Sequence, residues 1–153
     1  MDWKTLFLTP EGRIGRRDFW IGFAIIFAAG VVAGVIPLLG PLIGFLLIYP
    51  QVCVHAKRLH DMGRTAWLML IPGAVFLGAM IVATMMGGLA AMSGDFGAVH
   101  GAAMMATGLA FMLSFLVGLA FLLWIGLTAS QPGENRFGPP ARSLVGTGVS
   151  AEG

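Results

Sequence analysis

The sequence predicts an all-α membrane protein with four transmembrane helices arranged as two helical hairpins and both termini in the cytoplasm. Three observations lead to this prediction. The chain of 153 residues is 58% hydrophobic and only 10% charged, whereas a soluble domain carries about 25% charged residues. Its apolar residues form long runs without charges. All nine lysines and arginines fall in the segments that four spans would place on one side.

The first apolar run, residues 19–54, is long enough for two short spans, because one helix crosses the hydrocarbon with about 20 residues. Its stretch "IPLLGP" contains prolines, which interrupt helices. We therefore expect the first span at about 19–36 and the second at about 40–59. A single span followed by a re-entrant segment is the alternative.

Two further apolar runs predict spans at about 66–90 and 102–127. The residues between these spans, "SGDFGAVHG" (93–101), have the composition of a loop.

The spans divide the chain into a membrane domain and two flanking parts. The membrane domain covers residues 19–128. Residues 1–18 are predicted as an amphipathic cytoplasmic segment; they are polar and mixed in charge and do not resemble a cleavable signal peptide. Residues 129–153 are predicted as a cytoplasmic tail that is disordered after about residue 140.

The distribution of charge sets the predicted orientation. The loops on the opposite side contain no lysine or arginine. Of the seven acidic residues only Asp95 lies there. The predicted cytoplasmic side therefore carries all nine basic residues and six acidic ones. Basic residues in short loops favour the cytoplasmic side. The four tryptophans fall near the same surface, where indole rings concentrate. Both termini are therefore expected in the cytoplasm.

Small residues recur every four positions along the last span. Such a stripe lets membrane helices approach one another closely. We expect it to form a groove for the first or third span, and a homodimer face is the alternative. The stripe consists of Ala102, Ala106, Ala110, Ser114 and Gly118.

The polar stretch "KRLHDMGRTAW" is predicted as a tight hairpin at the cytoplasmic surface. If the second helix ends just before Gly63, this glycine takes the left-handed position that commonly follows a helix. Lys57, Arg58 and His60 then lie in the last turn of this helix, where cations complement the helix dipole. Thr65 is placed to cap the next helix.

Three polar clusters, in this order among four spans, resemble a small bacterial inner-membrane family, the domain of unknown function 805. "GRIGRRDFW" is similar to the family's GR-x-x-R-x-x-FW, "KRLHDMGRTAW" to RRLHD-x-G-x-SGWW, and "GENRFGPP" to G-x-NRYG-x. The departures, such as Lys57 for the first arginine and Phe137 for tyrosine, are mild. The resemblance covers about residues 5–140 and implies an integral protein of the bacterial inner membrane. It implies no established activity and no catalytic residues.

Each cluster combines arginine with a carboxylate, which allows two interpretations. The charges can pair with one another and tie the helix ends together, or they can bind a partner protein or an anionic lipid at the cytoplasmic face. Both can hold, because the bases outnumber the acids, and arginine suits bidentate contact with phosphate or carboxylate. The candidate residues are Arg13, Arg16, Asp18, Trp20, Arg58, His60, Asp61, Arg64, Trp67, Glu134, Asn135 and Arg136.

Other functions are less favoured. The interiors of the spans lack the ionisable side chains that mark proton coupling, which leaves a small transporter or channel component for a neutral solute as the alternative. An enzyme is not expected, because His60 and Asp61 are adjacent and project about 100° apart on a helix. No metal or cofactor is expected either. The net charge of +2 is too small to suggest a nucleic-acid partner.

Overall fold

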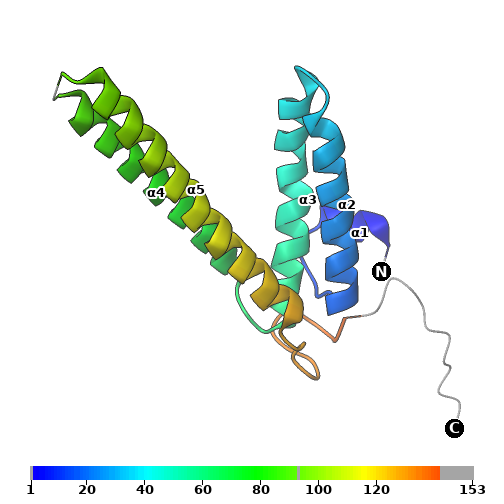
Figure 1. Cartoon of the computed structure of the whole chain (residues 1–153). Helices are drawn as coiled ribbons and strands as arrows, with labels where there is room; N and C mark the ends of the chain where they lie inside the picture. The colour runs from blue at the N-terminus through cyan, green and yellow to red at the C-terminus, as the bar shows by residue number, and fades with distance from the viewer. Residues whose placement is uncertain (1, 93, 142–153) are drawn as a thin grey trace, which may run out of the picture. The chain divides into compact units, whose positions relative to one another are not determined.

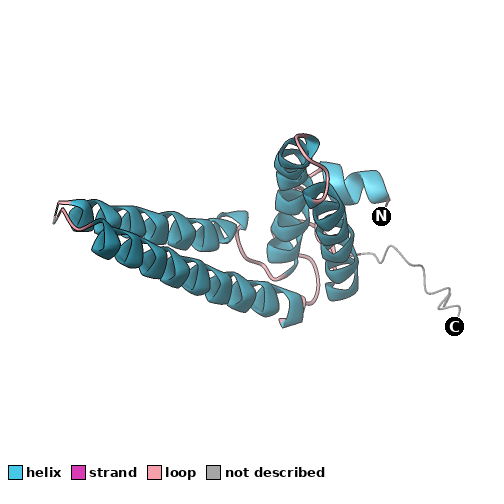
Figure 2. Ribbon diagram, turned by 45° about the horizontal axis from the view of Figure 1, so that its top comes forward, coloured by secondary structure: helices cyan, strands magenta, loops and turns pink. Residues whose placement is uncertain are grey.

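The computed structural model describes residues 2–92 and 94–141, and every regular element in that range is a helix. The prediction of an all-α chain is confirmed for these residues. The elements are α1 (Trp3–Leu8), α2 (Arg16–Gly34), α3 (Leu39–Asp61), the 3-10 helix η1 (Ala66–Met69), α4 (Leu70–Ala91) and α5 (Phe96–Leu127), drawn in Figures 1 and 2. The tail predicted to be disordered falls on residues 142–153, outside the described residues.

The chain divides into two compact units. The first unit contains the residues up to 68 together with those from 125 onward, and the second unit contains residues 69–124. In the described part of the chain, four helices are long and apolar enough to cross a membrane, as predicted. They cover Arg16–Gly34, Leu39–Asp61, Ala66–Ala91 and Val99–Leu127.

The short helix α1 packs against α3 in the first unit. Its N-cap is Asp2, whose carboxylate accepts the N–H of Thr5 at 2.6 Å. Hydrogen bonds from Thr5 hold the pKa of the Asp2 carboxyl below its ordinary value. Leu6 is fully buried, and the nearby Gly22 of α2 leaves room for it. The N-terminal segment is therefore part of the first unit's core.

The core of the first unit lies at the end of α2 and α3 that is farther from the turn joining them. Fully buried apolar side chains from every part of the unit meet there, which explains why this end is compact. They are Leu6, Ile14, Phe19, Cys53, Val54, Leu59 and Ile125. This arrangement places the polar clusters of the sequence around a rigid apolar centre.

Helices α2 and α3 run side by side and are joined by a tight turn (Figure 1). We predicted that the first span continues to residue 36, but α2 ends at Gly34 and α3 already begins at Leu39. The turn is closed by Leu38, the described non-glycine residue with positive φ, at 65°. Gly40 then lies directly against the carbonyl group of Ala33. The absence of a Cβ at Gly40 is what allows the two helices to meet at the turn.

Replacing Gly40 by alanine is expected to destabilise the first unit by about 1–3 kcal/mol, the usual cost of overpacking. A methyl group at Gly40 would overlap the carbonyl oxygen of Ala33, which belongs to the backbone and cannot rotate away. Gly44→Ala is the matched control, because a Cβ there meets nothing within 4 Å. Thermal unfolding of the detergent-solubilised chain measures both. Equal midpoints for the two variants would contradict the close approach.

The second unit consists of α4 and α5, which pack through small side chains. Ala106 and Ala110 of the predicted stripe are buried against Ala83, with Ala79 and Met80 beside them. These contacts favour the predicted intramolecular groove for that part of the stripe, and the homodimer face stays a prediction. A groove of about 460 Å³ with an almost wholly apolar lining runs along the same two helices.

The starts of the third and fourth predicted spans differ from the sequence prediction. We predicted a loop over residues 93–101, but α5 begins at Phe96, because the carboxylate of Asp95 accepts the N–H of Gly97 at 2.9 Å and caps the helix. The predicted third span opens as the 3-10 helix η1. The N–H of Leu68 donates to the carbonyl of Thr65 at 3.3 Å, so Thr65 begins this turn through its backbone.

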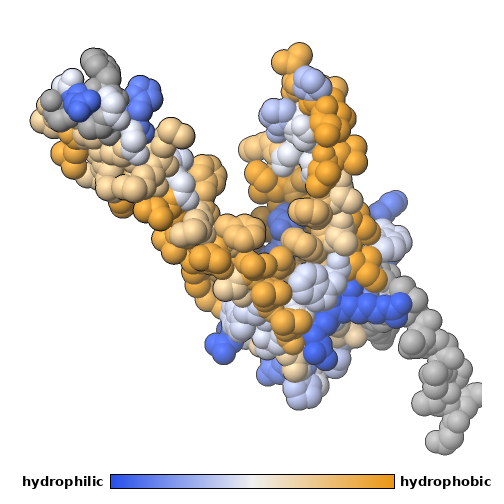
Figure 3. Space-filling model, viewed as in Figure 1, coloured by the Kyte–Doolittle hydropathy of each residue, from blue (hydrophilic) through white to orange (hydrophobic). Residues whose placement is uncertain are grey.

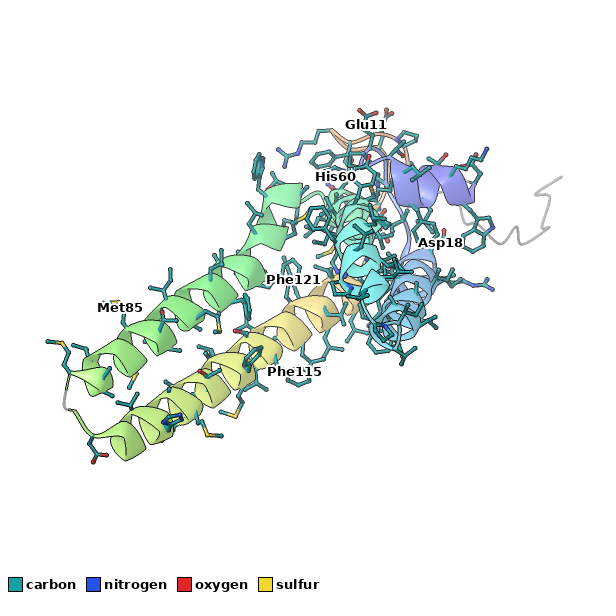
Figure 4. All side chains as sticks on the ribbon, turned by 90° about the horizontal axis from the view of Figure 1, so that it is seen from above. Glu11, Asp18, His60, Met85, Phe115 and Phe121 are labelled. Atoms are coloured by element: carbon teal, nitrogen blue, oxygen red, sulfur yellow. The ribbon has the colours of Figure 1, made fainter. Side chains whose placement is uncertain are left out.

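The long helices expose their large apolar side chains. Met85 and Phe115 lie on the outer sides of α4 and α5 (Figure 4) and are 62% and 67% exposed. Hydrophobic surface likewise covers the part of α2 and α3 near their turn, whereas hydrophilic surface gathers at the opposite end of that unit (Figure 3). This division between an apolar shaft and a polar end is typical of a protein embedded in lipid.

Candidate functional site

Three buried charged side chains form the centre of the polar end. Arg13 donates from Nε to Oδ1 of Asp61 at 3.2 Å, and Arg58 donates from Nη1 to Oδ2 of the same carboxylate at 2.5 Å. Each of these side chains is at most 1% exposed. We call Arg13, Arg58 and Asp61 the arginine lock. It joins the first and second polar clusters of the sequence, which lie 48 positions apart.

Arg13 connects the lock to the third cluster through backbone carbonyl groups. Its Nη1 donates to the carbonyl oxygens of Gly133 at 2.7 Å and Gly138 at 3.2 Å. Its Nη2 donates to the carbonyl of Gln131 at 2.6 Å. The loop after α5 is therefore wrapped around one guanidinium, and all three sequence clusters meet at this point.

Arg58 connects the lock to the end of α5. Its Nε donates to the carbonyl of Ile125 at 2.8 Å, its Nη2 donates to the carbonyl of Thr128, and its Nη1 lies 3.3 Å from Oγ of Ser130. The last carbonyls of a helix lack partners within it and carry partial negative charge. Arg58 supplies both the donors and the positive charge that the end of α5 needs.

Lys57 does the same for α1. Its Nζ donates to the carbonyls of Thr5 and Leu6, in the last turn of that helix. We predicted that Lys57, Arg58 and His60 lie in the last turn of α3, and this is confirmed for Arg58 and His60. The side chains of Lys57 and Arg58 also reach across to the ends of other helices.

The hairpin after α3 has the predicted form. Gly63 has a φ of 70°, its N–H donates to the carbonyl of His60 at 3.0 Å, and the N–H of Arg64 donates to Leu59 at 2.8 Å. These two bonds define a Schellman motif, which requires a left-handed residue at the position of Gly63. The predicted role of this glycine as the helix terminator is confirmed.

The segment "NRFG" forms a small turn that sits on the end of α3. Asn135 and Gly138 exchange backbone hydrogen bonds of 3.1 and 2.9 Å, and Nδ2 of Asn135 donates to the carbonyl of His60 at 3.0 Å. The ring of Phe137 stacks on the imidazole of His60, with centroids 3.9 Å apart. Figure 4 shows His60 at this end of the first unit, beside the loop after α5.

The remaining candidate residues divide into those near the lock and those on the surface. Asp18 is buried, Trp20 packs against Gly126, and Arg16 donates to the carbonyl of Leu127 at 3.5 Å. Arg16 itself is exposed, as are Arg64, Trp67, Glu134 and Arg136. Within residues 2–92 and 94–141, Asp61 forms ion pairs with Arg13 and Arg58. The pairings expected for Asp18 and Glu134 stay predictions.

A small cleft lies between the end of α3, the residues that follow its hairpin and the turn "NRFG". Its volume is about 310 Å³, and its lining combines aromatic, hydroxyl and basic groups. The lining residues are His60, Thr65, Ala66, Trp67, Arg136 and Phe137. The guanidinium carbon of Arg136 lies 4.7 Å from the centroid of the Phe137 ring, so this arginine is held at the edge of the cleft.

Sequence reasoning missed three contributors to the site. Gln131 and Ser130 offer oxygen atoms to the lock, and Lys57 anchors α1. Lys57 lies within a polar stretch that the sequence did single out, so its position was a usable signal. Gln131 contributes its backbone carbonyl, which every residue type has, so no sequence signal could have identified it.

Comparison with known proteins gives a consistent assignment. The profile of the family described as "Protein of unknown function (DUF805)" matches residues 7–139. The chain is similar to the uncharacterized protein YiiR of Escherichia coli strain K12 and to YiiR of strain O157:H7. Each is 34% identical over 142 residues, which cover 88% of this chain and 86% of the relative. No solved structure gives a significant match. The chain belongs to the DUF805 family of proteins of unknown function.

Proposed function

We propose that the chain is a non-enzymatic integral protein of the bacterial inner membrane whose fixed basic face binds the headgroups of anionic lipids on the cytoplasmic side. In this proposal the α2–α3 and α4–α5 pairs enter the membrane as hairpins, and both termini stay in the cytoplasm. The observation that carries the proposal is the cleft at the end of α3, which is lined by the exposed side chains of Arg136 and Trp67.

The distribution of charge supports the orientation. The described basic residues lie in α1, the loop before α2, the ends of α2 and α3, the hairpin after α3 and the loop after α5. The turns at the other ends of the two helix pairs contain none. Basic residues near spans favour the cytoplasmic side. The apolar character of the four long helices supports the insertion of both pairs.

The lock supports a fixed binding face. Arg13 and Arg58 donate hydrogen bonds to Asp61 and to backbone carbonyls. Their side chains therefore cannot turn outward without leaving these buried oxygens unpaired. Arg64 and Arg136 remain at the surface as donors for an external anion. Trp67, which is 77% exposed, has the side chain that prefers the interface between lipid and water. These three side chains together match a phosphate headgroup next to acyl chains.

The same contacts support a non-enzymatic role. Both carboxylate oxygens of Asp61 are bonded to arginines, which leaves this group poorly suited to accept a substrate proton. The imidazole of His60 is stacked on the ring of Phe137, and its backbone carbonyl accepts a hydrogen bond from Nδ2 of Asn135. His60 and Asp61, which resemble an active site in the sequence, therefore have contacts that suit a structural role.

Native mass spectrometry of the detergent-solubilised chain with added phosphatidylglycerol tests the proposal. We expect the wild-type chain to retain phosphatidylglycerol in preference to phosphatidylcholine. Since each basic residue near an anionic surface contributes about 1 kcal/mol, the double variant R64Q/R136Q is expected to lose roughly thirtyfold in apparent affinity.

The control variant K4Q/R17Q removes the same charge from exposed positions outside the cleft. Because neither side chain lines the cleft, this variant is expected to lose clearly less affinity than R64Q/R136Q. If both double variants lost the same affinity for phosphatidylglycerol, the loss would reflect net charge alone. That result would refute binding in the cleft. If a photocrosslinker at position 64 captured a cytoplasmic protein and no lipid, the ligand of this face would be a protein and the lipid proposal would be wrong.

A further inference from the structure

We propose that the α2–α3 hairpin does not cross the bilayer, and that its apolar tip, residues 35–41, ends among the acyl chains of the lipid. The hairpin would then be a re-entrant wedge inserted from the cytoplasmic side. Both termini stay on that side whether or not the hairpin emerges, so the proposal refines the proposed function and rests on its orientation. Three independent features of the first unit lead to it.

The tip has no polar side chain. From Ile21 to Ile48 the sequence contains no side chain that donates or accepts a hydrogen bond. The turn residues are nonetheless strongly exposed, Leu38 at 93% and Val35 at 76%. A turn that reached the outer surface would hold these side chains in water or among headgroups, at a cost that follows the apolar area exposed. Acyl chains are the surroundings in which this surface is stable.

The turn between α4 and α5 provides an internal comparison. It contains the exposed carboxylate of Asp95, and His100 follows in the first turns of α5. Figure 3 shows strongly hydrophilic residues at that turn, whereas residues 35–41 of the other turn contain no ionisable side chain. The spanning segment of α5, Val99–Leu127, has 29 residues, or about 43 Å of helix, which exceeds the hydrocarbon thickness of about 30 Å. The second unit therefore has the features of a complete crossing.

The backbone of the α2–α3 turn is also suited to hydrocarbon. Unpaired N–H groups are costly in lipid, and in this turn all N–H groups except that of Leu38 are either bonded to the backbone or absent. The bonds run from Val35 to Val32 at 3.3 Å, from Ile36 to Ala33 at 3.0 Å, from Leu39 to Pro37 at 2.7 Å and from Gly40 to Ile36 at 2.8 Å. Pro37 and Pro41 have no N–H to pair. The prolines that the sequence presents as a loop signal thus remove donors at the tip.

The depth of insertion follows from the position of α1. This helix packs beside Gly22 and Val54, and it carries Lys4 together with an exposed Trp3. Side chains of that kind favour the membrane surface. From Gly22 to the end of α2 at Gly34 is about 18 Å of helix, and from Val54 back to the start of α3 is about 22 Å. Both distances fall short of the hydrocarbon thickness of about 30 Å.

The full length of α3 overstates its reach for the same reason. Its 23 residues include the lock residues Arg58 and Asp61 and the anchor Lys57, all buried inside the protein. These groups are enclosed by α1, the N-terminal segment and the loop after α5. The last two turns of α3 therefore lie in the cytoplasm, outside the membrane. Only the remaining part of the helix is left to face lipid.

Labelling of single cysteines with a membrane-impermeant maleimide tests the proposal in intact cells with a permeabilised outer membrane. In a Cys53→Ala background, L38C places a thiol at the exposed tip, D95C at the other turn and E11C in the N-terminal segment. We expect D95C to react from outside, E11C to react only after lysis of the inner membrane, and L38C to stay unlabelled in both conditions until the protein is denatured in detergent.

The outcomes separate the proposals. If L38C reacted from outside at the rate of D95C, the hairpin would cross the membrane and the re-entrant wedge would be wrong, while the proposed orientation would stand. If E11C reacted from outside, the proposed orientation itself would fail. Labelling of L38C on lysis alone, like E11C, would place the tip in the cytoplasm and also overturn the wedge.

Spin labels at Leu38 and Val35 distinguish lipid from protein around the tip. In liposomes we expect both labels to collide frequently with oxygen, which concentrates in hydrocarbon, and rarely with a water-soluble nickel complex. Frequent collision with nickel would show that the tip reaches water. Rare collision with both reagents would show that protein covers the tip, and this result too would contradict contact with acyl chains.

Discussion

Replacing Asp61 by asparagine is expected to destabilise the first unit by about 3–5 kcal/mol, because it leaves two buried guanidinium groups without a counter-charge. Arg13 and Arg58 both bond this carboxylate, and their side chains are at most 1% exposed. Neither can reach water without breaking its bonds to the backbone around it. The asparagine side chain has nearly the same shape, so the loss measures charge rather than packing.

The chain contains its own reporter for this effect. Cys53 is the single cysteine and is fully buried in the core of the first unit. Its reaction with a maleimide in detergent solution measures how often the unit opens. We expect D61N to accelerate this reaction at least about a hundredfold, as a loss of 3 kcal/mol or more requires. Glu134→Gln removes an exposed carboxylate nearby as the control, and equal rates for the two variants would contradict the lock.

A double variant separates buried charge from general disruption. If the cost of D61N comes from uncompensated arginines, then removing Arg13 as well should cost less than the sum of the two single changes. Additive costs would indicate that Arg13 and Asp61 act independently, although they are 3.2 Å apart.

Local signals in the sequence were sufficient for the helices and for the end of α3. Apolar runs of span length predict long helices because the bilayer sets that length, and all four candidate spans were found. Gly63 was identified as a terminator because a left-handed position excludes most other residues. Errors arose where two local signals conflicted. The glycines of "SGDFG" suggested a loop, but Asp95 begins α5 within that stretch as an N-cap.

The contacts of the site were predicted in kind but not in detail. The sequence indicated that arginines and carboxylates of the three clusters share one face and can pair with one another. It could not indicate that Arg58 reaches Ile125 or that Arg13 reaches Gly133. Both acceptors are backbone carbonyls, which are present at every position, so only the folded chain identifies them.

Replacing Arg58 by lysine is expected to release the end of α5 from α3, although the charge is kept. The planar fork of Arg58 donates to Ile125, Thr128 and Asp61 in different directions, which one ammonium group cannot reproduce. Each lost hydrogen bond to a charged group costs about 1.5–3 kcal/mol. We expect a total loss of about 3 kcal/mol and much faster hydrogen exchange over residues 125–135, with little change within α4.

Arg64→Lys is the matched control, because it makes the same change at an exposed arginine in the adjacent hairpin. Unaltered exchange over residues 125–135 in R58K would show that the positive charge alone holds the loop. That result would also limit the lock to its ion pairs, since D61N removes charge while R58K removes geometry. If both variants open the first unit and R64K does not, the guanidinium fork of Arg58 is what joins the end of α5 to the end of α3. The basic face then owes its fixed form to this side chain.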